Sequence, residues 1–111
     1  MTWPEVGHPL PRVSDAYAPP EKWDWIVGEE GHGPHWRRVF GDVEAELLWD
    51  VFTALALTSP VSRVRNLGQL GRTGEVLMQL TLNNRTANVI TAWHYDYADA
   101  APRLVSAYPT T

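Results

Sequence analysis

The sequence contains no cysteine among its 111 residues. That absence excludes a disulfide framework, a thiolate zinc site, an iron–sulfur cluster and a cysteine nucleophile. It leaves the redox compartment open, and any metal would need histidine and carboxylate ligands.

Long apolar runs are also absent. No stretch approaches the ~18 to 20 apolar residues that span a bilayer, and the first residues, Met1-Thr2-Trp3-Pro4-Glu5, carry neither the basic start nor the apolar segment of a signal peptide. We therefore expect no membrane partner and a cytoplasmic location, in the producing cell or, after delivery, in a target cell.

Positive charge is scarce, with nine Lys and Arg residues against thirteen Asp and Glu. Domains that bind duplex nucleic acid are usually basic, so we expect no DNA partner. The imbalance is local, because residues 1–50 hold ten acids and four basic residues, whereas residues 51–111 hold five arginines and three acids. The second half can therefore still form a local anion site.

The remaining composition, 44% hydrophobic and 20% charged, is typical of one globular domain over residues 1–111. Five of the nine prolines lie in residues 1–20, which predicts an extended lead-in. We expect a helical half over 21–58 and a β-sheet half over 59–111.

Two helices are predicted in the helical half. The first covers 21–27 and stops at Gly28, and a glycine-rich loop over 28–35 follows it. Asp42 is expected to cap the second helix, which ends near Pro60. Its apolar residues step by three and four, as a core-facing helix requires: Val43, Leu47, Leu48, Val51, Phe52 and Leu55.

Strands are predicted over 61–66, 75–82, 85–95 and 103–108. Asn83-Asn84 suits a type I′ hairpin turn, which would pair Leu80 with Ala87, Met78 with Val89 and Val76 with Thr91. The opposite face then carries Gln79, Thr81, Thr86, Asn88 and His94. The predicted fold class is α+β, with N-terminal helices packed on a C-terminal antiparallel sheet of about four strands.

Two histidines and two arginines lie close together as His32, His35, Arg37 and Arg38. Histidines that titrate near neutrality can move the protons of RNA phosphodiester cleavage, and an arginine can stabilise charge on phosphorus. The alternatives are ordinary loop histidines, or a zinc site completed by His8, His94 or a carboxylate.

A second candidate is the last strand, with Arg103, Ser106 and Tyr108. Ser106 and Tyr108 are two residues apart and therefore point to one side, whereas Arg103 points to the other unless the strand twists or bulges. The alternative is structural, with Tyr108 packed at a sheet edge and Arg103 in a surface ion pair. The six tryptophans could stack on bases, but we expect most, including Trp23, Trp25, Trp36 and Trp93, to pack in the core.

The C-terminal half resembles a small bacterial family of toxin-like domains whose ending reads Asn-Gly-Arg, Thr-x-Trp, then Pro-Arg-Leu-Val-Thr-x-Tyr-Pro. The resemblance covers about 50 residues and rests on three main segments: Asn83-Asn84-Arg85, Thr91-Ala92-Trp93 and Pro102-Arg103-Leu104-Val105-Ser106-Ala107-Tyr108-Pro109. Ser106 replaces threonine and keeps the hydroxyl, and Asn84 replaces the turn glycine. More distantly, the order of helices and strands is similar to that of the barnase, EndoU, colicin and RelE ribonuclease toxins.

This resemblance implies a metal-independent endoribonuclease toxin without a cofactor, which leaves 2′,3′-cyclic phosphate ends. Its partners would be RNA, with tRNA as one candidate, and a cognate antitoxin or immunity protein. The implied catalytic residues are His32, His35, Arg37, Arg103, Ser106 and Tyr108, and the implied substrate-binding residues are Arg38, Arg85, Thr91 and His94.

The alternative function is a non-enzymatic protein-interaction or immunity module. The two hypotheses can be told apart by distance. An enzyme needs His32 or His35 near Arg103, Ser106 and Tyr108, whereas an interaction module does not.

Overall fold

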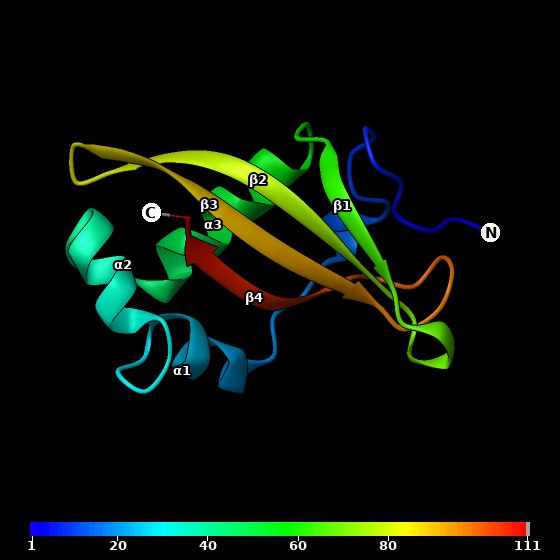
Figure 1. The fold of residues 1–111 in the computed structure, drawn as a ribbon, viewed down its shortest axis with the longest axis horizontal. Helices are drawn as coiled ribbons and strands as arrows, with labels where there is room; N and C mark the ends of the chain where they lie inside the picture. The colour runs from blue at the N-terminus through cyan, green and yellow to red at the C-terminus, as the bar shows by residue number, and fades with distance from the viewer. Residues whose placement is uncertain (111) are drawn as a thin grey trace.

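A computed structural model describes residues 1–110. Its helices and strands follow one another in two separate blocks (Figure 1), and the four strands form one antiparallel sheet in the order β1-β2-β3-β4. This arrangement confirms the predicted α+β class. The elements are η1 (Val13–Asp15), α1 (Pro20–Val27), α2 (Gly33–Phe40), α3 (Ala45–Ala56), β1 (Val61–Asn66), η2 (Gly68–Leu70), β2 (Arg72–Leu82), β3 (Arg85–Tyr95) and β4 (Arg103–Pro109).

The β2–β3 hairpin is the longest feature of the sheet. Asn83 and Asn84 have φ angles of 52° and 61°, as a type I′ turn requires. The predicted pairs Leu80 with Ala87, Met78 with Val89 and Val76 with Thr91 are confirmed. The amide of Asn83 donates to the carbonyls of Phe40 (2.9 Å) and Asp42 (2.8 Å), so the turn is tied to the end of α2.

The core lies between the helices and one face of the sheet, called here the inner face. Trp36, Phe40 and Phe52 from the helices are fully buried against Trp93 and other inner-face residues. The indole of Trp36 also donates to the carbonyl of Ala107 in β4, at 3.3 Å. Strand alternation puts the remaining side chains of each strand on the opposite, outer face.

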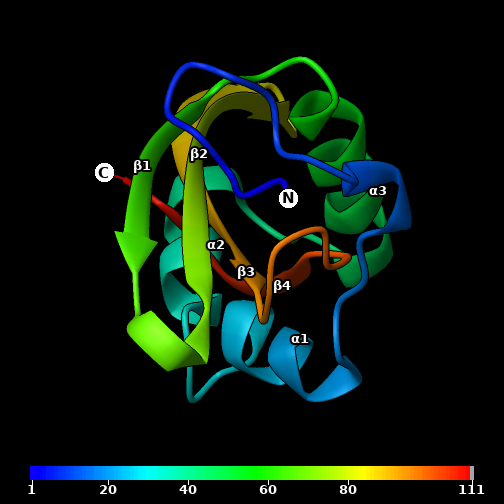
Figure 2. The same ribbon diagram turned by 90° about the vertical axis from the view of Figure 1, so that its right-hand side faces the viewer.

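The proline-rich lead-in does not extend away from the domain. It passes across the end of the molecule between β1 and α3 (Figure 2), and its Leu10 and Val13 belong to the core. Single bridges join Val6 to Val61 in β1 and Tyr17 to Arg103 in β4. The lead-in thus covers part of both sheet edges, which limits pairing with other chains.

Three predicted boundaries are wrong. The predicted loop over 28–35 ends early, because Gly33 and Pro34 begin α2, where a proline costs no hydrogen bond. The helix expected at Asp42 begins at Ala45 after Glu44 and ends at Ala56, and β2 begins at Arg72 instead of residue 75. No helix in the described part of the chain is long and apolar enough to cross a membrane.

Candidate functional site

A β-bulge in β4 decides which side chains share the outer face. In the β3–β4 pairing, Ala92 is opposite Ser106 and His94 is opposite Arg103, so the register shifts by one residue at Val105. Paired residues lie on the same face of a sheet, and Ala92 and His94 are on the outer face. The bulge therefore puts Arg103 on the same face as Ser106 and Tyr108, the exception that the sequence left open.

The outer face holds a depression of about 270 Å³ that crosses all four strands. Arg65 enters it from β1, Glu75 from β2, and Ser106 and Tyr108 from β4. The Nε atom of Arg65 lies 3.6 Å from a carboxylate oxygen of Glu75. This distance exceeds that of a strong charged hydrogen bond, so the guanidinium can reach a further anion. The depression, called here the outer-face site, is lined by Arg65, Leu67, Thr73, Glu75, Ala92, Val105, Ser106 and Tyr108.

His32 contacts Tyr108, one of the residues that line the outer-face site. It lies immediately before α2, and its ring centroid is 5.5 Å from that of Tyr108 and 5.3 Å from that of Trp25. The His32 amide donates to the Trp25 carbonyl at 2.8 Å. A Cβ at Gly31 would meet that same carbonyl at 1.8 Å, so a glycine is needed for the close approach that places the imidazole.

The environment of His32 favours its neutral form. Burial lowers the pKa of His32 below its ordinary value, and the positive charge of nearby His35 lowers it further. His35 lies one turn along in α2, on the same side of the helix. Two histidines one turn apart are the residue types that can serve as a base and an acid in one reaction.

Arg37 and Arg38 lie on the exposed side of α2 and do not line the outer-face site. Arg37 forms an ion pair with Glu29, with a shortest distance of 2.6 Å. Arg38 instead borders a separate depression with Gln79, Thr86 and Asn88. The structure therefore brings neither Arg37, a predicted phosphate ligand, nor Arg38, a predicted substrate-binding residue, to Ser106 and Tyr108.

Arg103 and Arg85 are placed at opposite ends of the sheet. Arg103 binds both carboxylate oxygens of Asp96 at 2.7 Å, and this ion pair raises its pKa despite partial burial. Arg85 follows the hairpin turn, nine residues along β3 from the partner of Arg103, which corresponds to ~30 Å at about 3.3 Å per residue. The two arginines cannot contact one phosphate.

Thr91 and His94, both predicted to bind substrate, make hydrogen bonds within the protein. Thr91 is fully buried on the inner face, where its hydroxyl accepts the indole N–H of Trp93 at 2.8 Å. His94 belongs to the outer face, but the η2 connection covers it. Its Nδ1 is 2.9 Å from the Thr73 hydroxyl and its Nε2 is 2.7 Å from the Leu70 carbonyl, so both ring nitrogens are engaged.

Sequence reasoning missed Arg65 and Glu75. Side chains in a strand point alternately to the two faces of the sheet, so Arg63 and Arg65, two residues apart, are expected on the same face. The two residues are brought together by the pairing of β1 with β2. The sequence does not reveal this pairing directly, because a glycine-rich connection separates the two strands. Trp25, expected in the core, is 50% exposed beside His32.

Within residues 1–110, no three histidine, aspartate or glutamate side chains come together as a metal site would require. Comparison with protein-family models, curated proteins and solved structures finds no match to this chain. The toxin-like resemblance consequently stays a prediction.

Proposed function

We propose that this protein is a metal-independent endoribonuclease-like toxin domain whose catalytic centre is the outer-face site. The observation that carries the proposal is the contact between His32 and Tyr108. It joins a titratable group of the helical half to the hydroxyl-bearing strand, and Tyr108 and Ser106 line the same depression as Arg65.

The proposed reaction begins with a proton transfer. Neutral His32 takes the proton of a ribose 2′-hydroxyl, and the 2′-oxygen then forms a bond to phosphorus. The bond from phosphorus to the 5′-oxygen breaks, and protonated His35 supplies the proton to that leaving oxygen. The products are a 2′,3′-cyclic phosphate and a 5′-hydroxyl, so the step needs neither water nor a metal.

The remaining residues of the site supply charge and orientation. Arg65 replaces Arg37 and Arg103 as the proposed phosphate ligand because it lines the depression and they do not. Its contact with Glu75, at 3.6 Å, is also longer than the contacts of Arg37 with Glu29 and of Arg103 with Asp96. Ser106 and Tyr108 donate hydrogen bonds to non-bridging oxygens of the phosphate. Glu75 holds Arg65 in place from the neighbouring strand.

The acidic composition is compatible with this activity. A single exposed RNA loop is recognised by stacking and local contacts more than by total charge. Trp25, half-exposed and adjacent to His32, offers a ring on which a base next to the cleaved bond can stack.

The test is incubation of the purified protein with total RNA and with a tRNA pool in the presence of EDTA. We expect cleavage to cyclic phosphate ends, lost in His32→Ala and in His35→Ala. His8→Ala is the matched control, since this histidine is exposed in the lead-in outside the outer-face site. A substrate with 2′-deoxyribose at the cleaved position should resist the wild-type protein.

Two results would overturn the proposal. One is equal cleavage by wild type and both histidine variants, which would indicate a contaminating nuclease. The other is no cleavage by well-folded protein on either RNA pool, which would favour the alternative of a non-enzymatic interaction or immunity module.

A further inference from the structure

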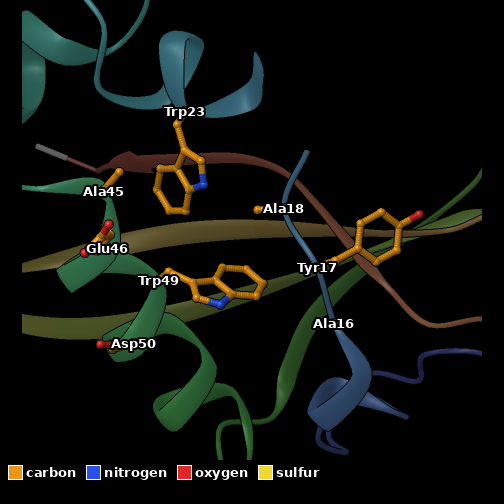
Figure 3. Close-up of a pocket in the computed structure, with 8 residues that line it drawn as sticks. All are labelled: Ala16, Tyr17, Ala18, Trp23, Ala45, Glu46, Trp49 and Asp50. Atoms are coloured by element: carbon orange, nitrogen blue, oxygen red, sulfur yellow. The ribbon is translucent and has the colours of Figure 1, made fainter. Parts of the chain in front are cut away.

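A second hollow lies on the opposite side of the molecule's core, between α1, α3 and the end of the lead-in. Its volume is about 560 Å³, within the range of small-molecule sites. Figure 3 shows the indoles of Trp23 and Trp49 next to each other at its wall, with Tyr17 further along the lead-in segment. We call it the tryptophan pocket; it is lined by Ala16, Tyr17, Ala18, Trp23, Ala45, Glu46, Trp49 and Asp50.

The aromatic wall is held rigidly from behind. Trp23 stacks on buried Phe52 with ring centroids 6.5 Å apart and planes at 15°, and Trp49 packs on buried Trp93 at 5.9 Å. Trp23 and Trp49 also meet edge to face at 6.3 Å. Both indoles thus line the pocket while they pack on buried aromatic rings, so the wall is present before any ligand arrives.

The pocket carries uncompensated negative charge. Glu46 and Asp50 lie one turn apart on α3 and are both exposed. Neither takes part in an ion pair within residues 1–110, and no lysine or arginine lines the pocket. Other exposed carboxylates in this range, such as Glu30 and Asp42, are also outside the ion pairs, but they do not line an aromatic pocket.

We propose that the tryptophan pocket binds an organic ammonium cation. Ring faces attract a cation through their quadrupole, most strongly for tryptophan, and the two carboxylates add charge complementarity. A calcium ion would need six to eight oxygen ligands, more than the two carboxylates of the pocket supply. A ligand with an ammonium head and a short alkyl body meets both the charge and the apolar surface. This proposal is independent of ribonuclease activity, because the pocket and the outer-face site share no residue.

The test follows the indole N–H signals of the full-length protein by ¹H–¹⁵N NMR during titration with choline. We expect saturable shifts of the Trp23 and Trp49 signals, assigned with Trp→Phe variants, while the buried Trp36 signal stays in place. The neutral isostere 3,3-dimethylbutan-1-ol and an equal concentration of sodium chloride should each leave all these signals nearly unchanged.

The charge requirement has its own pair of variants. The double variant Glu46→Gln, Asp50→Asn should weaken choline binding at least about fivefold, roughly 1 kcal/mol. The matched double variant Glu30→Gln, Asp42→Asn removes the same charge from exposed positions outside the pocket and should bind as the wild type does.

Ammonium groups occur both on free amines and on protein lysines, and one further titration separates these sources. Tighter binding of an acetylated Gly-Lys-Gly amide than of choline would indicate a lysine of a partner protein, and the reverse would indicate a free quaternary amine. Equal shifts with choline and with the neutral isostere, or no saturable shift with either cation, would overturn the proposal.

Discussion

The imidazole of His32 and the phenol ring of Tyr108 lie 5.5 Å apart, centroid to centroid. One residue precedes α2 and the other is near the end of β4, so their contact depends on α1 and α2 packing against the last strand. The ring of Trp25 also contacts the imidazole, with centroids 5.3 Å apart. These two ring contacts give His32 a packing role in addition to its proposed role as a base.

Chemistry and packing at His32 can be separated with two variants. His32→Phe should abolish RNA cleavage with almost no change in the free energy of unfolding, because the ring contacts persist. His32→Ala should abolish cleavage and also lower stability by about 1 kcal/mol, the usual worth of an aromatic contact. Cleavage assays and urea denaturation check both expectations. Full activity in His32→Phe would exclude proton transfer by this residue.

The pKa of His32 should be measurable in the folded protein. Burial and the charge of His35 both lower it, so an NMR titration of the imidazole should have its midpoint below pH 6.5. Because the folded state favours neutral His32, its contribution to stability is lost as the pH falls below 6.5. His35→Gln should return the midpoint only part of the way, since burial is the larger cause. A midpoint at or above 6.5 in the wild type would contradict this electrostatic picture.

Arg65 is expected to be the arginine that matters for cleavage. Arg65→Gln removes the guanidinium from the outer-face site and should lower the cleavage rate by on the order of a hundredfold. The Glu75 side chain is only 15% exposed, so loss of its arginine partner should also lower the free energy of unfolding by about 1 to 3 kcal/mol, and cleavage is compared for the folded fraction. Arg85→Gln, an equal charge change at the hairpin turn, is the control and should keep nearly full activity. Equal losses in both variants would indicate only general attraction of RNA.

Thr91 offers a test of a structural role against a substrate-binding one. Thr91→Val keeps the side-chain shape but leaves the buried indole N–H of Trp93 without its acceptor. We expect a loss of about 1 to 3 kcal/mol in the free energy of unfolding, measured by urea denaturation, and unchanged cleavage by the folded fraction. Thr91→Ser keeps the hydroxyl and should be closer to wild type. A cleavage defect at unchanged stability would instead restore the substrate-binding prediction.

Local chemistry explains which parts of the fold were predictable. The strict alternation of Val76, Met78, Leu80 and Leu82, followed by Asn83-Asn84, contains both the strand period and the turn type, so the hairpin register follows from neighbouring residues alone. The whole of α2 was missed because it begins with glycine and proline, which usually interrupt regular structure but also suit the first turn of a helix.

The candidate site depended on contacts that short sequence patterns do not contain. His32, His35, Ser106 and Tyr108 were selected by residue type, but residue type does not show that Asp96 engages Arg103 or that η2 covers His94. The acidic tryptophan pocket likewise forms only where α1, α3 and the lead-in meet.

The sequence by itself determined the α+β class, the hairpin and the residue types available for chemistry, because periodicity, turn preference and titration are local properties. Tertiary structure decided which of those residues share a surface. The bulge at Val105 turned Arg103 to the outer face, the pairing of β1 with β2 brought Arg65 beside Glu75, and the packing of the helices against β4 placed His32 on Tyr108. Each of these depends on strand register or element packing, which is set by the whole core rather than by any one segment.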